Sequence, residues 1–116
     1  MRVLRIVPNI AAGDAAARQT FYEDFLGLGV VMDHGWTATY ASPEDASHQV
    51  SAIDRDASAP VDPAVSFGVD DVDAFHAAAV RHGVEIVYGP VDEPWGVRRF
   101  FVRAPGGAVV NIVGHR

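Results

Sequence analysis

Along the chain, apolar runs typical of strands and apolar positions at helical spacing follow one another in a fixed order, and this order occurs twice. In the first half, short apolar runs at residues 3–10, 30–32, 36–41 and 50–53 predict strands. Between the first two runs, Phe21, Phe25 and Leu28 recur at intervals of four and three, which indicates a helix with one buried stripe. Asp14 is a suitable N-cap for this helix, and Gly27 a suitable residue past its end. The first half is therefore predicted to be βαβββ.

The second half repeats this order. Apolar runs at residues 64–69, 84–88, 97–103 and 108–113 predict strands, and residues 72–82 form a helical pattern with Val72, Phe75 and Ala79 on one face. Asp71 stands where Asp14 stands in the first half. The prediction is a single α+β domain, with module one at residues 1–54, a polar connector at 55–63 and module two at 64–116.

Composition narrows the functional classes. The 116 residues include nine Arg and no Lys against fifteen acidic residues, for a net charge of −6, which disfavours nucleic-acid binding. The absence of cysteine excludes disulfides and zinc–thiolate sites, and the absence of lysine excludes Schiff-base chemistry through that residue. With no signal-peptide pattern and no membrane-length apolar run, we expect a cytoplasmic protein without a membrane partner.

The two strands at residues 97–103 and 108–113 are expected to form a hairpin that lines a ligand site. If Ala104 to Gly107 form the turn, residue 100 faces 111 and residue 98 faces 113, so Arg98, Phe100 and Asn111 share one face. A slip of one residue would replace Arg98 with Arg99 on that face, and the sequence leaves this choice open.

The same register, transferred to module one, predicts that Trp36, Ala38, Tyr40 and Gln49 lie on the corresponding face. Trp95 lies in a turn just before the hairpin. Aromatic rings combined with an arginine and two amides suit a planar ligand that needs stacking and hydrogen bonds. Core packing of the rings, and strand-end hydrogen bonding by Gln49 and Asn111, are the structural alternatives.

Several motifs resemble one superfamily. Phe21-Tyr22-Glu23-Asp24-Phe25-Leu26-Gly27-Leu28 resembles its "FY…LG" helix end, and Pro94-Trp95-Gly96-Val97-Arg98 followed by Ala104-Pro105-Gly106-Gly107 resembles its "PWG…R…DPxG" hairpin. The superfamily is the vicinal oxygen chelate group, which contains glyoxalase I, bleomycin-resistance proteins and extradiol dioxygenases. The resemblance implies two βαβββ modules in a curved mixed sheet around a cavity, and a homodimer.

Metal enzymes of this superfamily carry His on the first strand and Glu on the last strand of a module. Transferred to this sequence, the His positions are Val7 and Ala64 and the Glu positions are Gln49 and Asn111. The aspartate of the family turn is replaced by Ala104. Because aliphatic side chains cannot bind a divalent ion and neutral amides bind one weakly, we expect no metal and no other cofactor.

The resemblance is therefore nearest to the bleomycin-resistance branch, in which the cavity holds a bulky ligand without chemistry. The sequence predicts a metal-free protein that sequesters a planar or cationic small molecule, such as an antibiotic. The alternative is a lyase, isomerase or dioxygenase with a non-standard metal site, and no catalytic residue is assigned. The predicted ligand-binding residues are Trp36, Tyr40, Gln49, Trp95, Arg98, Phe100 and Asn111.

Overall fold

The computed structural model describes residues 1–116, which divide into two compact units. One unit consists of Val7–Ser58, and the other of Met1–Ile6 together with Ala59–Arg116. The boundary between residues 58 and 59 falls within the predicted connector. No helix of the chain is long and apolar enough to cross a bilayer.

The first module contains one helical segment and four strands. Its elements are β1 (Val3–Ala11), α1 (Ala15–Arg18) continuing into the π-helix η1 (Gln19–Phe25), β2 (Gly29–Asp33), β3 (Thr37–Ala41) and β4 (Gln49–Ile53). Within Val7–Ser58 the hydrogen-bonded strand order is β2-β3-β4-β1, and β1 runs parallel to β4. Asp14 caps α1 by accepting a hydrogen bond from the Ala17 N–H at 3.0 Å, as predicted.

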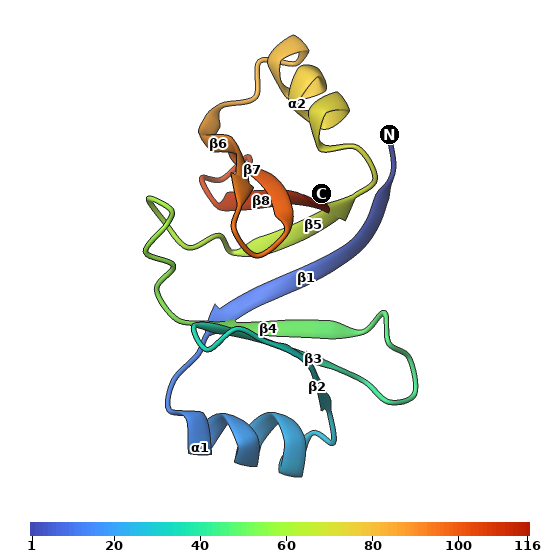
Figure 1. The fold of residues 1–116 in the computed structure, drawn as a ribbon, viewed down its shortest axis with the longest axis vertical. Coiled ribbons are helices and arrows are strands. Elements are labelled where there is room, and N and C mark those ends of the chain that lie inside the picture. Colours follow the sequence, from blue (N-terminus) through green and yellow to red (C-terminus); the bar gives the residue numbers. More distant parts are fainter. The chain divides into compact units, whose positions relative to one another are not determined.

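The second module repeats this plan with β5 (Val65–Val69), α2 (Val72–Arg81), β6 (Ile86–Glu93), β7 (Val97–Arg103) and β8 (Val109–His115) (Figure 1). In this unit the strand order is β1-β5-β8-β7-β6, with β5 parallel to β8. The side chain of Asp71 caps α2 by accepting from the Ala74 N–H at 3.0 Å. The predicted α+β class and the two βαβββ modules are therefore confirmed.

Strand β6 is the largest departure from the prediction. It was expected to end at residue 88, but it continues to Glu93 through irregular pairing with β7 on either side of Tyr88. Gly89 makes this possible because it adopts a φ of +81° and because a Cβ there would lie 2.6 Å from the Arg99 carbonyl oxygen. The extension brings Glu93 into the strand.

Each module has a core on the side of the sheet that faces its helix, and the second module has another hydrophobic cluster on the opposite side, made of Ala59, Phe101 and Val109. In the first module the core contains Tyr22 from η1 and Tyr40 from β3, whose rings stack at 4.7 Å. The predicted buried stripe is therefore wrong for Phe21 and Phe25, which are 50% and 73% exposed, and only Leu28 of that stripe packs against the core.

In the second module the core on the helix side contains Val72 from α2 and Phe100 from β7. We name this side of the second-module sheet the helix face, and the opposite side, which carries Asn111, the site face.

Candidate functional site

The register of the β7–β8 hairpin decides which side chains share the site face. Phe101 lies opposite Asn111, and Arg99 lies opposite Val113. The predicted pairing of residue 100 with 111 is wrong by one position because the turn is one residue longer than expected: the Ala104 N–H donates to the Ala108 carbonyl at 2.8 Å. Asn111 therefore shares its face with Phe101 and Arg99 and not with Phe100 and Arg98.

Arg98 and Phe100 consequently lie on the helix face. The Arg98 guanidinium donates to Asp73 on α2 at 2.9 Å and to Asp92 on β6 at 3.1 Å. These two carboxylates raise the pKa of Arg98 above its ordinary value. Phe100 is 1% exposed and packs edge-on against His76 of α2 at 5.2 Å. The positions of both side chains support α2, and their predicted role as ligand contacts stays a prediction.

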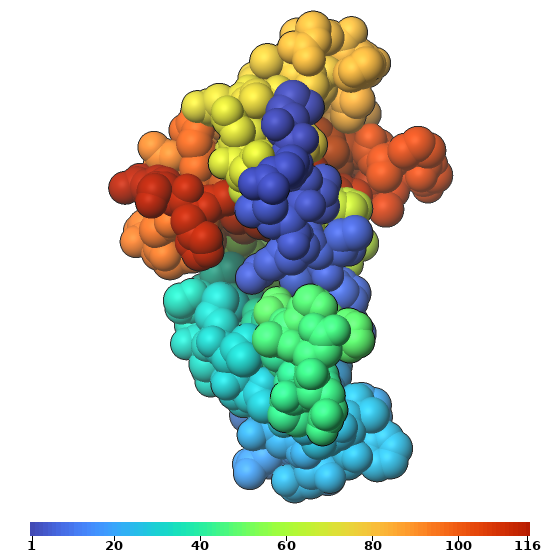
Figure 2. Space-filling model, turned by 90° about the vertical axis from the view of Figure 1, so that its right-hand side faces the viewer, coloured from blue at the N-terminus to red at the C-terminus, as the bar shows by residue number.

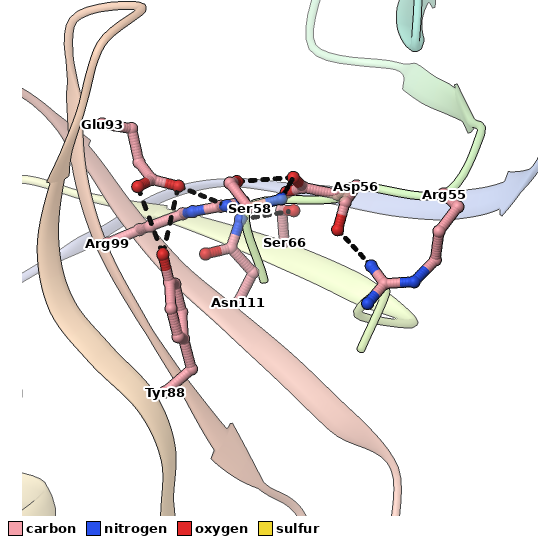
Figure 3. Close-up of polar contacts among 8 residues, drawn as sticks. All are labelled: Arg55, Asp56, Ser58, Ser66, Tyr88, Glu93, Arg99 and Asn111. Carbon is pink, nitrogen blue, oxygen red and sulfur yellow. Dashed lines mark hydrogen bonds and ion pairs between the residues drawn. The ribbon is translucent and has the colours of Figure 1, made fainter. Parts of the chain in front are cut away.

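A buried ion pair occupies the site face at the β6–β7 edge. The Arg99 guanidinium pairs with the Glu93 carboxylate, and the two residues are 4% and 3% exposed. Tyr88 donates a hydrogen bond to the same carboxylate at 3.2 Å (Figure 3). Three rings surround the guanidinium carbon: Trp95 and Phe101 each at 5.0 Å from it, and Tyr88 at 5.6 Å. Trp95 thus contacts Arg99, and its predicted role in ligand binding is untested.

Asn111 is the one side-chain amide of the second module and is 7% exposed. Its Nδ2 donates to the Ser66 Oγ on β5 at 3.0 Å (Figure 3), whereas its Oδ1 accepts no hydrogen bond from the chain. A buried acceptor without a donor costs about 1–3 kcal/mol. A molecule that donates an N–H or O–H group to Oδ1 would recover part of this energy.

In the first module, the predicted grouping of Gln49 with Tyr40 and Ala38 is wrong. Gln49 pairs with Ala41, which places it on the opposite side of the sheet from Tyr40. Its Nε2 donates to the Ala46 carbonyl at 2.9 Å. Tyr40 is 3% exposed and belongs to the core under the helix.

Trp36 directly precedes β3 and is partly exposed. Its carbonyl accepts the Asp54 N–H at 2.6 Å. The predicted ligand contact of Trp36 stays a prediction.

The structure identifies Ser51, not Gln49, as the first-module counterpart of Asn111. Asn9 lies five residues before the cap Asp14 and pairs with Ser51, as Ser66 lies five residues before the cap Asp71 and pairs with Asn111. The Ser51 hydroxyl makes a buried 2.7 Å hydrogen bond with Thr39. Aligning the modules on their helix caps would not have found Ser51, because the offset between Asp14 and Asp71 places Asn111 on Asp54. Only the pairing of β1 with β4 identifies Ser51.

The residues at the four expected ligand positions do not fit a divalent metal. Val7 is an aliphatic residue with 1% exposure, and Ala64 has only a methyl group. Ser51 offers a hydroxyl that is engaged with Thr39, and Asn111 offers one neutral amide oxygen, which is a weak ligand for a divalent ion. No group of three or more His, Cys, Asp or Glu side chains is arranged to hold a metal anywhere in residues 1–116.

A family model described as "Glyoxalase/Bleomycin resistance protein/Dioxygenase superfamily" matches residues 2–112. The chain belongs to this superfamily. A search of curated proteins finds no significant match.

Solved structures share the fold at low sequence identity. A glyoxalase/bleomycin resistance protein/dioxygenase superfamily member from Vibrio splendidus 12B01 is 18% identical, with a TM-score of 0.70 over 95% of this chain and 97% of that one. Methylmalonyl-CoA epimerase from Mycobacterium tuberculosis is 20% identical, with a TM-score of 0.69 over 98% and 87%. The Mn(II)-bound glyoxalase from Novosphingobium aromaticivorans is 21% identical, with a TM-score of 0.62 over 97% and 38%. One of these three structures, the glyoxalase, is described as bound to Mn(II).

Tyr88 provides a pH-dependent test of the ion-pair cluster. Burial and the neighbouring Glu93 carboxylate raise the pKa of its phenol. Because the folded pKa lies above the unfolded one, the stabilisation from this group is complete below about pH 10 and is lost as the pH rises through the folded pKa. We expect the ultraviolet difference titration of wild type against Tyr88→Phe to show a tyrosine that ionises above the ordinary range. Ionisation of Tyr88 at or below the ordinary value would contradict the burial of this cluster.

Proposed function

We propose that the protein binds a small organic molecule on the site face of its second module, without a metal held at the superfamily ligand positions. The observation that carries this proposal is the donor set: the positions that correspond to the imidazole and carboxylate ligands of the superfamily carry Val7, Ala64, Ser51 and Asn111, with Ser51 assigned by strand pairing in place of the expected Gln49. Members of the superfamily carry their functional residues on a sheet of this type. In this chain, the polar groups on the sheet suit hydrogen bonding better than metal coordination.

Asn111 is the residue we expect to contribute most to ligand binding. Its Oδ1 is a buried acceptor without a donor from the chain, so a ligand N–H or O–H group placed there makes a hydrogen bond that the free protein lacks. The Glu93 carboxylate, by contrast, is engaged by Arg99 and Tyr88 and is a poor site for an additional cation. The ligand we propose is planar and apolar with a polar edge, and an antibiotic of this type is the first class to test.

Calorimetric titration of the full chain with bleomycin and with acridine orange tests this proposal. We expect one saturable binding event, and an affinity about tenfold lower for Asn111→Leu, which loses the amide but keeps the number and branching of the side-chain heavy atoms. The matched control is Phe25→Ala, because Phe25 is 73% exposed on η1 in the other module. Equal affinities for wild type and Asn111→Leu would remove Asn111 from the site, and no heat with either compound would contradict the proposed binding of a planar ligand.

An enzyme with a non-standard metal site is the second candidate, favoured by the metal-bound and epimerase structures that share this fold. Elemental analysis of protein purified without chelator separates the two candidates. Less than stoichiometric divalent metal supports the binding protein, whereas one tightly held ion per chain supports the enzyme. Pairing of two chains in a homodimer stays a prediction.

A further inference from the structure

A small hollow of about 120 Å³ adjoins the site face where β1, β5 and β8 meet. Its walls include Leu4, Arg5, Gly68, Val97, Val113 and His115. Gly68 and Val113 are paired in the sheet two residues beyond the Ser66–Asn111 pair, so the hollow continues the same row of side chains. Figure 2 shows the first residues of the chain, in dark blue, on the surface of the molecule.

Arg5 is held in the wall of this hollow by a glycine. A Cβ at Gly68 would lie 2.7 Å from the Arg5 Cγ and 3.3 Å from its Cδ and Nε, so the arginine stem lies directly against the Gly68 backbone. A glycine in a strand interior marks a close approach of this kind. The stem is therefore fixed against Gly68, while Arg5 as a whole residue is exposed to solvent.

The Arg5 guanidinium has no acceptor in the chain. Seven of the nine arginines pair with a carboxylate or donate to a carbonyl; Arg5 and Arg81 do neither. Arg81 lies in the last turn of α2, outside the hollow. An arginine with five N–H donors that lines a hollow without an internal partner is suited to an external oxyanion.

The charge around the hollow supports the same conclusion. The chain carries a net charge of −6, yet the lining of the hollow contains an arginine and a histidine and no carboxylate. The nearby Glu93 is neutralised by Arg99. The rest of the wall is apolar. The volume of the hollow corresponds to about four water molecules, which is enough for a carboxylate and the first carbons attached to it.

We propose that this hollow binds the carboxylate of a small organic acid through Arg5, while the apolar body of the acid packs against Leu4, Val97 and Val113. The inference rests on the proposed function and narrows its ligand to one with an acid group at this end. It replaces the cationic ligand class predicted from the sequence, because the lining of the hollow carries Arg5 and His115 and no carboxylate although the chain as a whole is acidic.

Three compounds that each contain a benzene ring but differ in charge test which charge the hollow prefers in its ligand. Benzoate, benzamide and benzylamine are titrated into the ¹⁵N-labelled full chain, and backbone amide shifts are followed by NMR. We expect benzoate to shift the amides of Gly68, Val113 and His115 and to bind about tenfold or more tightly than benzamide, with benzylamine weakest, because an Arg–carboxylate contact is charge-assisted.

Two variants and a matched control assign the effect to Arg5. Arg5→Gln is expected to abolish the preference for benzoate, and Gly68→Ala to weaken it by displacing the Arg5 stem while the charge is kept. Arg81→Gln removes one equally unpartnered charge elsewhere and is expected to retain the preference. Unchanged amide spectra of the free variants verify that each one folds.

The outcomes separate this inference from the proposed function. Equal binding of the three compounds would overturn the carboxylate site and leave ligand binding in place. An equal loss of the preference for benzoate in Arg5→Gln and Arg81→Gln would do the same. No shift with any of the three, together with binding of the planar compounds titrated by calorimetry, would also overturn the carboxylate site alone. Absence of binding in both experiments would overturn both proposals.

Discussion

Replacing Glu93 by alanine is expected to lower the free energy of unfolding by about 3 kcal/mol, because removing one partner of a buried ion pair leaves the other charge in a poorly solvated place. Glu93 and Arg99 are 3% and 4% exposed, and Tyr88 also loses its acceptor in this variant. Urea denaturation followed by Trp95 fluorescence measures the change close to the pair, since the Trp95 ring lies 5.0 Å from the Arg99 guanidinium. A Trp36→Phe background removes the other tryptophan.

The control for this prediction is another Glu–Arg pair in the same module. Glu85 pairs with Arg103 at 3.2 Å, but the two side chains are 60% and 42% exposed. Glu85→Ala should therefore cost less than about 1 kcal/mol. Similar losses for Glu93→Ala and Glu85→Ala would show that the Glu93–Arg99 pair is solvated in the folded protein.

The fold could be predicted from the sequence because its signals are local. The caps Asp14 and Asp71, and the period that predicts the first helix, depend only on residues a few positions apart. Which face of that helix is buried was not predicted correctly, because Phe21 and Phe25 are exposed and Tyr22 is buried.

The extension of β6 to Glu93 could not be predicted from local signals, because Gly89 and Pro90 usually end a strand. Only the pairing with β7 shows that the glycine forms a bulge there.

The site was harder to predict because its composition depends on register. A turn longer by one residue exchanges Arg98 and Phe100 for Arg99 and Phe101 on the face of Asn111. No local pattern distinguishes these two registers in the run Arg98-Arg99-Phe100-Phe101, where each residue type occurs twice. Asn111 itself was identified correctly as a member of the hairpin, and its role in binding awaits the Asn111→Leu titration.

The second large loss of stability is expected on replacement of Phe101. This residue is 0% exposed and connects a hydrophobic cluster to the ion pair of Glu93 and Arg99. Its ring packs with Ala59 and Val109, contacts the Tyr88 ring at 5.1 Å and lies 5.0 Å from the Arg99 guanidinium. Phe101→Ala should lower the free energy of unfolding by about 3–5 kcal/mol through lost burial and the cavity left behind. Urea denaturation in the Trp36→Phe background measures this loss by the fluorescence of Trp95.

Two further variants, Phe25→Ala and Phe101→Leu, separate the effect of burial on stability from the effect of the aromatic ring. Phe25 is 73% exposed, so its replacement should change stability by about 0.5 kcal/mol or less. Phe101→Leu keeps most of the apolar volume but removes the aromatic face over Arg99, so its loss should fall between the other two. If Phe101→Leu were as damaging as Phe101→Ala, the ring contacts with Arg99 and Tyr88 would outweigh the cavity as the source of stability. If Phe101→Ala instead cost no more than Phe25→Ala, the hairpin register that places Phe101 beside Asn111 would be wrong, and the assignment of the site face would have to be reversed.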